Sequence, residues 1–246
     1  GFNTNPVGAD AEIEFCLAKT DPMGNPTSGI NRVFQPQQGF TFNQFDNIVK
    51  PANTWNPAQY LNIYTTDLLG VLLGYAYFPG INIPSLDAVV VDFRSVGRMP
   101  ANPFPGFFGG AFSGGRTATH EIGHYFNLFH PFDNGCDINN NCASTGDRVC
   151  DTPSDATGDF GCPAQTFACG NQTLNQTYME FVNDNCMNLF TKGQKVRMLA
   201  ALNGPRSSLL NSTACNISFQ TSNITQNTAT LTWSDLLAPL YNVRWR

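Results

Sequence analysis

The sequence is poor in charge and has no long hydrophobic run. Charged residues make up 13% of the 246 residues, about half the usual share, and the formal net charge is −5. An acidic balance argues against a nucleic-acid partner, because nucleic acid selects basic surfaces. The longest apolar stretch, residues 68–78, is interrupted by Gly70 and Gly74 and is too short for a membrane span. With 41% hydrophobic residues, the chain can still build a substantial core, so we expect a folded domain.

No Cys-x-x-Cys pair occurs among the eight cysteines, which disfavours a cysteine zinc ribbon or a thioredoxin-like redox motif. Seven of the eight lie between Cys136 and Cys215, in stretches rich in Gly, Asn and Asp. Clusters of this kind indicate disulfide bonds, which persist in oxidising compartments. The chain starts at Gly1, without an initiator methionine or the charged and apolar regions of a signal peptide. We therefore expect a secreted protein in a mature or trimmed form.

The hydrophobic patterns predict both helices and strands. The strand candidate at residues 88–93 is apolar enough to be central in a sheet. Thr191 and Gln194 form a capping box that opens a helix. Between residues 131 and 176 periodicity disappears, and a loop of that length needs disulfides or bound ions to hold it. Strands are predicted at residues 11–18, 60–66, 72–78 and 88–93, and helices at residues 38–50, from Thr117 and from Thr191.

All three histidines of the chain lie in one eleven-residue window. On a helix, His120 and His124 share a face and can bind one metal ion, and Glu121 can reach a water on that ion as general base. Two surface histidines on an amphipathic helix would give the same short motif by chance, but His130 adds a third ligand. To bring His130 back, the helix must end in a tight turn, where Asn127 replaces the usual glycine and tolerates left-handed backbone. Three imidazoles with an open fourth position are typical of catalytic zinc.

This pattern is that of the metzincin metallopeptidases. Metzincins also have a methionine-containing turn beneath the zinc, and Tyr178-Met179-Glu180-Phe181 resembles it. Four further segments, IEFCLA from Ile13, YLNIY from Tyr60, GDRVCDTP from Gly146 and NCMNLFT from Asn185, resemble the pappalysin family and its ulilysin-like members. The resemblance extends from about residue 11 to about residue 210.

The resemblance implies a zinc-dependent endopeptidase that hydrolyses protein or peptide bonds, with Glu121 as the base and Met179 packed under the imidazoles. The implied fold is α+β: a metzincin-type catalytic domain with a twisted mixed β-sheet, an active-site helix and a Met-turn. An inhibitory pro-segment is a possible partner. The rival hypothesis is a zinc-containing binding module of a multidomain adhesive protein that has lost turnover. Retention of Glu121 favours the enzyme, because a structural zinc needs no base.

Two positions depart from the family pattern. Similar proteases carry a tyrosine two residues after the turn methionine, where its hydroxyl can stabilise the oxyanion, and this chain has Phe181. Zinc alone could carry that charge, Tyr178 could substitute, or activity could be reduced. Relatives that prefer basic side chains after the scissile bond have an acidic pocket residue just before the cysteine that follows the Met-turn. Here Asn185 stands there beside Asp184, so both are candidate pocket residues and an arginine preference is in doubt.

A calcium site and three disulfides are further implications of the resemblance. The loop after His130 contains Asp147, Asp151, Thr152, Asp155 and Asp159. Aspartates of this kind also form turns and cap helices, but hard oxygen ligands suit Ca²⁺, and the resemblance favours calcium with Asp147 and Thr152 as ligands. Ulilysin-like pairing joins Cys142 to Cys169 and Cys162 to Cys186, with Cys136–Cys150 as a plausible addition and Cys16 and Cys215 left over.

The C-terminal residues differ in character from the rest of the chain. Residues 213–246 alternate apolar and polar positions and resemble the start of a fibronectin type III module, which needs about 90–100 residues. We therefore expect a catalytic domain at residues 1–212 followed by an incomplete β-rich segment. The alternative is a pair of strands that pack on the catalytic domain.

Overall fold

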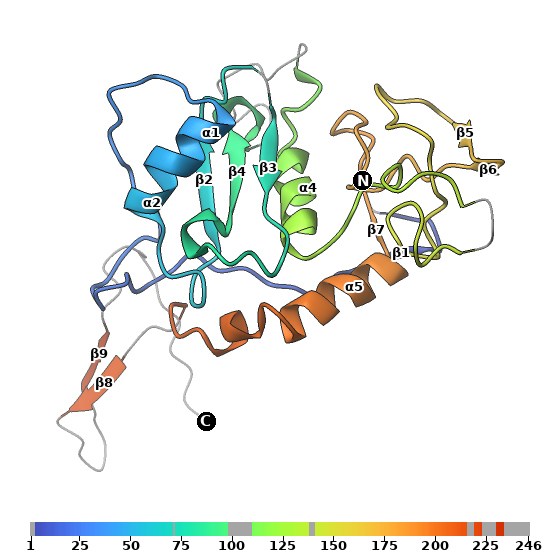
Figure 1. The fold of residues 1–246 in the computed structure, drawn as a ribbon. Coiled ribbons are helices and arrows are strands. Elements are labelled where there is room, and N and C mark those ends of the chain that lie inside the picture. The colour runs from blue at the N-terminus through green and yellow to red at the C-terminus, as the bar shows by residue number, and fades with distance from the viewer. Residues whose placement is uncertain are drawn as a thin grey trace.

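A three-stranded mixed sheet forms the centre of the fold (Figure 1). The computed structural model describes residues 3–70, 72–97, 110–137, 141–215, 219–222 and 230–233. Strand β4 (Ala88–Asp92) lies between β2 (Asn62–Thr66), to which it is parallel, and β3 (Gly74–Ala76), to which it is antiparallel. All five residues of β4 are buried, which confirms its predicted central place.

Helical layers cover both faces of this sheet, because side chains of a strand alternate between its two faces. Val90 packs into a core with Phe45 and Val49 of the first helical layer, whereas Val89 and Val91 pack into a second core with Tyr125 and Met179. The first layer consists of α1 (Phe42–Gln44), the π-helical η1 (Phe45–Val49) and α2 (Lys50–Asn53). The second contains α4 (Arg116–Tyr125).

Two sequence expectations for the first half are wrong. Residues 11–18 form no strand. The helix predicted to end at residue 50 continues to Asn53, because Pro51 lies in the first turn of α2, where a missing backbone N–H is tolerated. The helix also begins later than expected, at Phe42, after Thr41 accepts a hydrogen bond from the Gln44 N–H.

Helix α5 (Lys192–Asn203) lies beneath the domain and begins with the predicted capping box of Thr191 and Gln194. The buried residues of this helix are Gln194, Met198 and Ala201, whereas the apolar Val196 is 67% exposed. Short elements complete the described fold: β1 (Gly8–Ala9) paired with β7 (Phe190–Thr191), β5 (Phe167–Ala168) with β6 (Asn171–Gln172), and the 3-10 turns η2 (Pro84–Leu86), η3 (Phe93–Ser95) and η4 (Ser207–Asn211).

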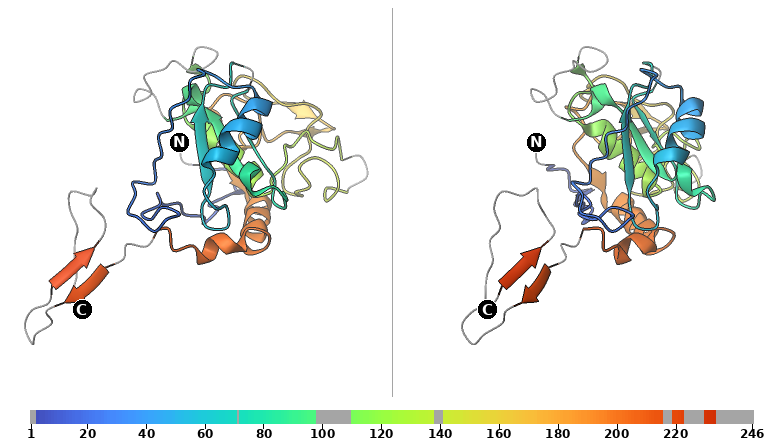
Figure 2. Two further views of the ribbon diagram at one scale, coloured as in Figure 1. Left: turned by 60° about the vertical axis from the view of Figure 1, so that its left-hand side comes forward. Right: turned by 90° about the vertical axis from the view of Figure 1, so that its left-hand side faces the viewer.

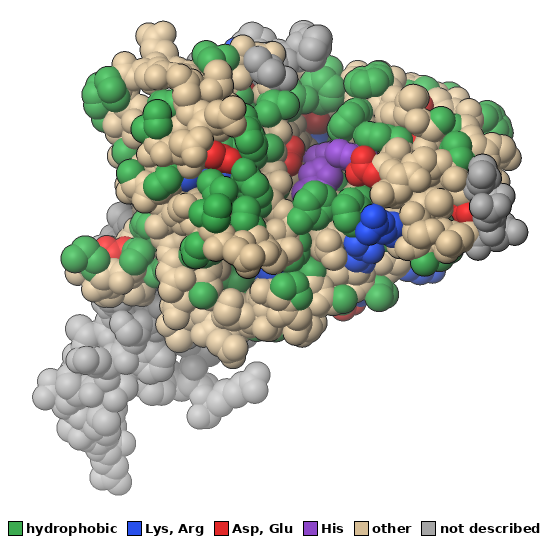
Figure 3. Space-filling view, viewed as in Figure 1, with side chains coloured by type: hydrophobic (Ala, Val, Ile, Leu, Met, Phe, Trp, Pro, Cys, Tyr) green, Lys and Arg blue, Asp and Glu red, His purple; other side chains and the backbone are tan. Residues whose placement is uncertain are grey.

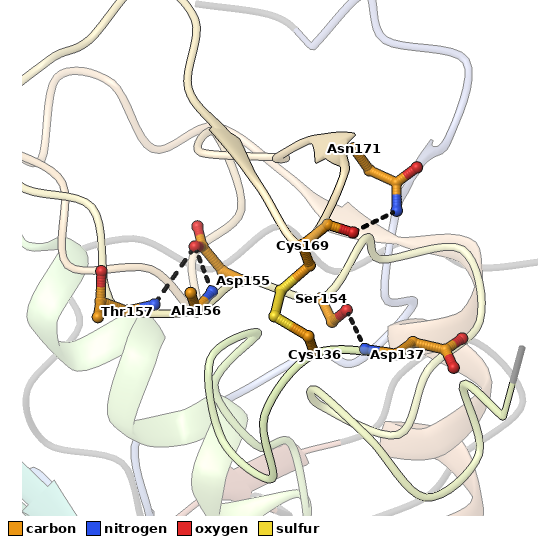
Figure 4. The surroundings of a disulfide bond; sticks show 8 residues. All are labelled: Cys136, Asp137, Ser154, Asp155, Ala156, Thr157, Cys169 and Asn171. Carbon is orange, nitrogen blue, oxygen red and sulfur yellow. Dashed lines mark hydrogen bonds between the residues drawn. A yellow bond between two sulfur atoms is a disulfide. The ribbon is translucent and has the colours of Figure 1, made fainter. Parts of the chain in front are cut away.

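The disulfides correct two of the expected pairs. The structure joins Cys16–Cys215, Cys136–Cys169, Cys142–Cys150 and Cys162–Cys186. The expected pairs Cys142–Cys169 and Cys136–Cys150 are wrong, because the fold of residues 141–150 places Cys150 beside Cys142. Successive turns, with Ser144 N–H bonded to Asn141 O and Arg148 N–H to Thr145 O, fold residues 141–150 back on themselves. The hairpin β5–β6 then brings Cys169 to Cys136, with a Cα separation of 5.2 Å (Figure 4).

The β-rich C-terminal segment contains an antiparallel pair, β8 (Phe219–Ser222) and β9 (Thr230–Trp233). This pair projects away from the other elements in both views of Figure 2. Before it, the chain is still attached to the main body of the fold, because Lys19 N–H donates to Ala214 O and Cys215 is bonded to Cys16. The division of the chain at residue 212 stays a prediction, and residues 234–246 of the expected β-rich segment lie outside the described residues.

Within the described ranges, none of the helices combines the length and apolar character that crossing a membrane requires.

Candidate active site

The three histidines meet at one point. Helix α4 presents His120 and His124 on one face, and their Nε2 atoms are 3.0 Å apart. The Nε2 atom of His130 lies 3.1 Å from that of His120 and 3.0 Å from that of His124. Among the described residues, this is the only group of three or more His, Cys, Asp or Glu side chains whose ligand atoms converge in this way.

The other ring nitrogen of each histidine is held by an oxygen. Nδ1 of His120 lies 2.7 Å from Tyr178 O, and Nδ1 of His124 lies 2.7 Å from Leu128 O. Nδ1 of His130 is 3.2 Å from the Asp133 carboxylate, which also accepts from the His130 N–H. Because these oxygens require a proton on Nδ1, each neutral imidazole turns an unprotonated Nε2 toward the shared point.

This donor set fits a metal ion. Burial lowers the pKa of all three histidines, that of His124 to about 4, so neutral rings are favoured. Three nitrogen lone pairs facing one another repel unless a cation lies between them. Nitrogens on three corners of a tetrahedral zinc site are about 3.3 Å apart, close to the observed spacing.

The turn that returns His130 to the site follows the end of α4. Asn127 has a φ of 74°, the left-handed conformation expected from the sequence. Leu128 N–H donates back to Gly123 O, and the Arg197 Nε atom of α5 donates to Asn127 O at 2.6 Å. The position of His130 therefore depends on contacts from outside α4, whereas the helical period alone places His120 and His124 on the same face.

Glu121 lies beside the histidines and is only 5% exposed. Burial raises the pKa of its carboxyl to about 8, and Oε2 has no hydrogen-bond partner among the described residues. Its side chain packs directly on Gly74 of β3, where a Cβ atom would come within 2.9 Å of Glu121 Cγ. A glycine inside a strand often marks such a close approach. The glycine at position 74 is therefore the sequence feature that points to this contact with Glu121.

The site opens into a cleft of about 1000 Å³. Figure 3 shows histidine side chains at the base of a hollow on this face of the molecule. At the N-terminal end of α4 the cleft is lined by Thr117 and Asp184, and near the C-terminal end by Phe129 and His130. Phe78, Phe160 and Phe181 contribute aromatic walls. The cleft is thus long enough to extend past both sides of the histidines.

Met179 and Phe181 lie in the turn segment that follows the long loop. Met179 is fully buried, and a Cβ atom at Gly123 of α4 would lie 2.4 Å from its sulfur, so the side chain fills the space under the helix. The Phe181 ring lies 4.9 Å from the His130 ring, between centroids. Tyr178 does not line the cleft, because its ring packs on Phe190. The structure therefore offers no support for Tyr178 as a substitute oxyanion donor.

Of the two predicted pocket residues, only Asp184 lines the cleft. Its Oδ2 atom accepts hydrogen bonds from the N–H groups of Gly114 and Arg116 at the start of α4, at 2.7 and 3.1 Å. Its Oδ1 atom is buried without a partner in the described part of the chain. Asn185 is exposed and is not among the residues that line the cleft. Asp184 thus joins the active-site helix to the wall of the cleft.

The predicted calcium ligands are close together. Burial raises the pKa of Asp147 to about 6, although this carboxylate accepts hydrogen bonds from Val149 N–H and Gln194 Nε2. The buried Thr152 hydroxyl lies near the Asp147 carboxylate and opposes part of the rise in its pKa. Asp151 has a different role, because its carboxylate accepts from Thr191 Oγ1 and Gly193 N–H at the start of α5.

The other two aspartates of the loop also accept hydrogen bonds. Asp155 Oδ1 accepts from the N–H of the next residue, Ala156 (Figure 4), which matches the turn-forming role considered as the alternative. Asp159 Oδ2 accepts from Thr173 Oγ1, 14 residues along the chain, and so joins two distant parts of the loop.

Comparison with known proteins places the chain in a family. The model of the peptidase family described as pregnancy-associated plasma protein-A matches residues 43–203. Extracellular metalloprotease 1 of Coccidioides posadasii is 39% identical over 140 residues, which are 56% of this chain and 48% of that protein. An extracellular metalloprotease of Sordaria macrospora is 39% identical over 147 residues, which are 58% of this chain and 48% of that protein. The chain spans about half the length of these curated relatives.

Solved structures agree with the sequence comparison. Mature mirolysin of Tannerella forsythia, in complex with a cleaved peptide, is 35% identical with a TM-score of 0.71, over 82% of this chain and 76% of that one. A promirolysin mutant from the same organism gives a TM-score of 0.70 at 35% identity, over 82% and 67%. The matched region contains the histidine site, and the chain belongs to the pregnancy-associated plasma protein-A family of peptidases.

Proposed function

We propose that this chain is the catalytic part of a secreted zinc-dependent endopeptidase. The observation that carries the proposal is the convergence of three Nε2 atoms, with Glu121 beside them, at the base of an open cleft. The names of the curated relatives as extracellular metalloproteases support both the activity and the location outside the cell. They also favour an enzyme over the rival binding module.

His120, His124 and His130 would hold the zinc ion. When bound, zinc lowers the pKa of a water ligand to about 7 and polarises a carbonyl oxygen. Glu121 would accept the proton of the attacking water and transfer it to the leaving amine. This role requires an ionised carboxylate with an oxygen that is not already held by another hydrogen bond. Burial alone favours the protonated acid near neutral pH, but the positive charge of a bound zinc ion would favour the carboxylate, and Oε2 has no hydrogen-bond partner among the described residues. Thus the base is held in place by packing on Gly74 and remains available for proton transfer.

We assign the turn around Met179 as the Met-turn of the metzincin fold, because the buried thioether supports the helix that carries two ligands. Phe181 supports His130 from one side with its ring and supplies no hydroxyl. The oxyanion therefore receives no hydrogen bond from this position. Asp184 is the pocket residue that we propose for substrate side chains at the N-terminal end of α4.

A calcium ion held by Asp147 and Thr152 is a further part of the proposal. The buried Thr152 hydroxyl and the buried Asp147 carboxylate supply the hard oxygen atoms that Ca²⁺ prefers. Bound calcium would offset the free-energy cost of burying the charged Asp147 carboxylate. It would also hold the loop against α5, because Asp147 accepts a hydrogen bond from Gln194 of that helix. Thermal unfolding measured with and without added Ca²⁺ tests it. Asp147→Asn should remove the stabilisation by calcium.

We further propose the division into a catalytic domain at residues 1–212 and the start of a fibronectin type III-like module at residues 213–246. The antiparallel β8–β9 pair and its separation from the body support the second part. The existence of a promirolysin among the solved relatives supports an inhibitory pro-segment for this protein as well.

Cleavage of casein by the purified chain tests the proposed activity. The controls are Glu121→Ala and a sample treated with a chelator, and zinc content is measured on each protein. We expect cleavage only by the untreated protein, and the same zinc content in Glu121→Ala. Full zinc occupancy without cleavage by the unaltered chain would contradict the proposal and support the binding module instead.

A further inference from the structure

Two arginines outside the catalytic group lie against the cleft. The guanidinium carbons of Arg148 and Arg197 are each 4.9 Å from the centroid of the Phe129 ring. Phe129 lines the cleft and directly precedes His130, so both cations lie at the end of the cleft near the C-terminus of α4. In Figure 3, a group of Lys and Arg side chains lies beside the histidines of the same hollow.

Neither arginine has an ion-pair partner in the described ranges, unlike Arg94 and Arg206, which pair with aspartates. Arg148 donates one hydrogen bond, from Nη2 to Asn134 Oδ1, and Arg197 donates one, from Nε to Asn127 O. A guanidinium has five N–H donors, so most donors of both groups remain for a ligand. Arg148 is exposed and Arg197 is half-buried. Neither arginine itself lines the cleft, but both stack on Phe129, and Arg148 donates to Asn134, and these two residues do line it.

Holding these two side chains together is unfavourable without an anion. Burial and the charge of Arg148 lower the pKa of Arg197, and Asp147 opposes this only in part. Arg148 also keeps a φ of 61°, a backbone conformation that few residues other than glycine adopt. The whole chain, both arginines included, carries a net charge of −5, so two adjacent cations without an acidic ion-pair partner among the residues that the structure describes are a local exception. Uncompensated charge and strained backbone are typical of a place where a ligand completes the interactions.

We propose that Arg148 and Arg197 form an anion subsite that binds an acidic side chain of the substrate at the His130 end of the cleft. This inference rests on the proposed peptidase function. A carboxylate is the anion that an unmodified peptide offers, and guanidinium groups bind it through two parallel hydrogen bonds. Phe129 serves as the platform that holds both cations beside the bound chain. The C-terminal carboxylate of a peptide has the same chemistry and must be distinguished by experiment.

The test uses a neutral reference peptide that the protein cleaves, with an amidated C-terminus. A series of amidated peptides carries one Gln→Glu change at each position on either side of the scissile bond, and one neutral peptide has a free C-terminus. We expect a glutamate at one position to raise kcat/KM roughly two- to fivefold for each arginine it contacts. The advantage should shrink as ionic strength is raised to about 0.5 M, since exposed charges are screened.

Arg148→Gln should bring the ratio of the glutamate peptide to the neutral peptide down toward one. Arg197→Gln should do the same, with its zinc content measured because Arg197 also contacts the turn before His130. The matched control is Arg32→Gln, an exposed arginine that does not stack on Phe129, which should keep the full ratio.

Cleavage of the neutral peptide with no advantage for glutamate at any position would overturn the inference and leave the peptidase function standing. A response to the free C-terminus alone would also overturn it, because the subsite would then bind chain ends. An advantage that survives in both Arg148→Gln and Arg197→Gln would assign it to other residues. Failure to cleave any peptide, the neutral one included, would overturn the peptidase function and this inference with it.

Discussion

The two sides of the active site are built in different ways. On one side, His120, Glu121 and His124 lie on a regular helix that packs against a buried sheet. On the other, His130 directly precedes residues 131–176, whose described part contains only the short strands β5 and β6 and is held by disulfides and side-chain hydrogen bonds. The comparison shows that the candidate metal site combines two histidines placed by the period of one helix with a third placed only by tertiary contacts.

The largest expected effect is on the helical side. Glu121→Gln keeps the shape of the side chain but removes the base, so kcat should fall by about 10²–10⁴-fold. Because Glu121 is not a ligand, zinc affinity should change little. Steady-state kinetics on a peptide, together with a zinc titration, measure both. A variant with unchanged kcat would show that proton transfer is carried by another group.

The disulfides test the irregular side. The chain-entropy relation assigns the Cys136–Cys169 bond, which closes 33 residues, about 3.7 kcal/mol of stability, and the Cys142–Cys150 bond, which closes 8, about 2.5 kcal/mol. Replacing both cysteines of a bond by serine should therefore lower the free energy of unfolding, and more for Cys136–Cys169 than for Cys142–Cys150. Urea unfolding measures both losses. Peptide mapping without reduction checks the pairing itself. Recovery of a Cys142–Cys169 peptide would contradict the structure and restore the family-based pairing.

The turn at Asn127 lies at the boundary between the two sides. Its left-handed backbone should accept Asn127→Gly with little loss, whereas Asn127→Ala should cost about 1 kcal/mol, since a Cβ disfavours that conformation. The loss should appear mainly as weaker zinc binding, because the turn positions His130. A competition titration with a chelator measures it. Equal zinc affinity in the alanine and glycine variants would show that the turn does not position His130.

The two sides should respond to pH with opposite sign. Burial opposes ionisation of Asp92 in the sheet, but hydrogen bonds from Arg94 and from Leu68 N–H outweigh it and lower the pKa. Asp92 therefore contributes stability above its unfolded pKa, near 3.8, which is lost as pH falls. Burial raises the pKa of Glu180 to about 8. An acid with a raised pKa favours the folded state at low pH, so its contribution is lost as pH rises from about 4.5 to about 8.

Two variants separate these contributions. The difference in Tm between Glu180→Gln and the unaltered chain should be a few degrees more favourable to the variant at pH 8 than at pH 5. Each kcal/mol of stability corresponds to about 2–4 °C in Tm for a chain of this size. Asp92→Asn should lower Tm at pH 7 and have a smaller effect at pH 3. Thermal unfolding over this pH range measures both, and a Tm difference for Glu180→Gln that does not vary with pH would contradict the assignment.

The same division explains what could be predicted from the sequence. Strand β4, helix α4 and the cap of α5 follow from local apolar periodicity and from Thr191 with Gln194, which act within a few residues. The left-handed turn at Asn127 was predictable because it was required by the spacing of the histidines.

What could not be predicted depends on contacts between distant segments. The partner of Cys169 is decided by how residues 141–150 fold back, and the contact of Arg197 with Asn127 O joins residues 70 positions apart. Asp133 as the partner of His130 carries no distinct signal, since single aspartates are common in turns. Polar residues of the irregular segment therefore needed the structure to be assigned.

Zinc titration of the metal-free chain, with peptide cleavage followed at each step, tests the central claim most directly. The account predicts that activity rises in proportion to bound zinc and reaches its maximum at one zinc ion per chain, and that Glu121→Gln binds the same single ion without comparable cleavage. Cleavage by the metal-free chain, or a chain saturated with one zinc ion that cleaves no peptide, would contradict it.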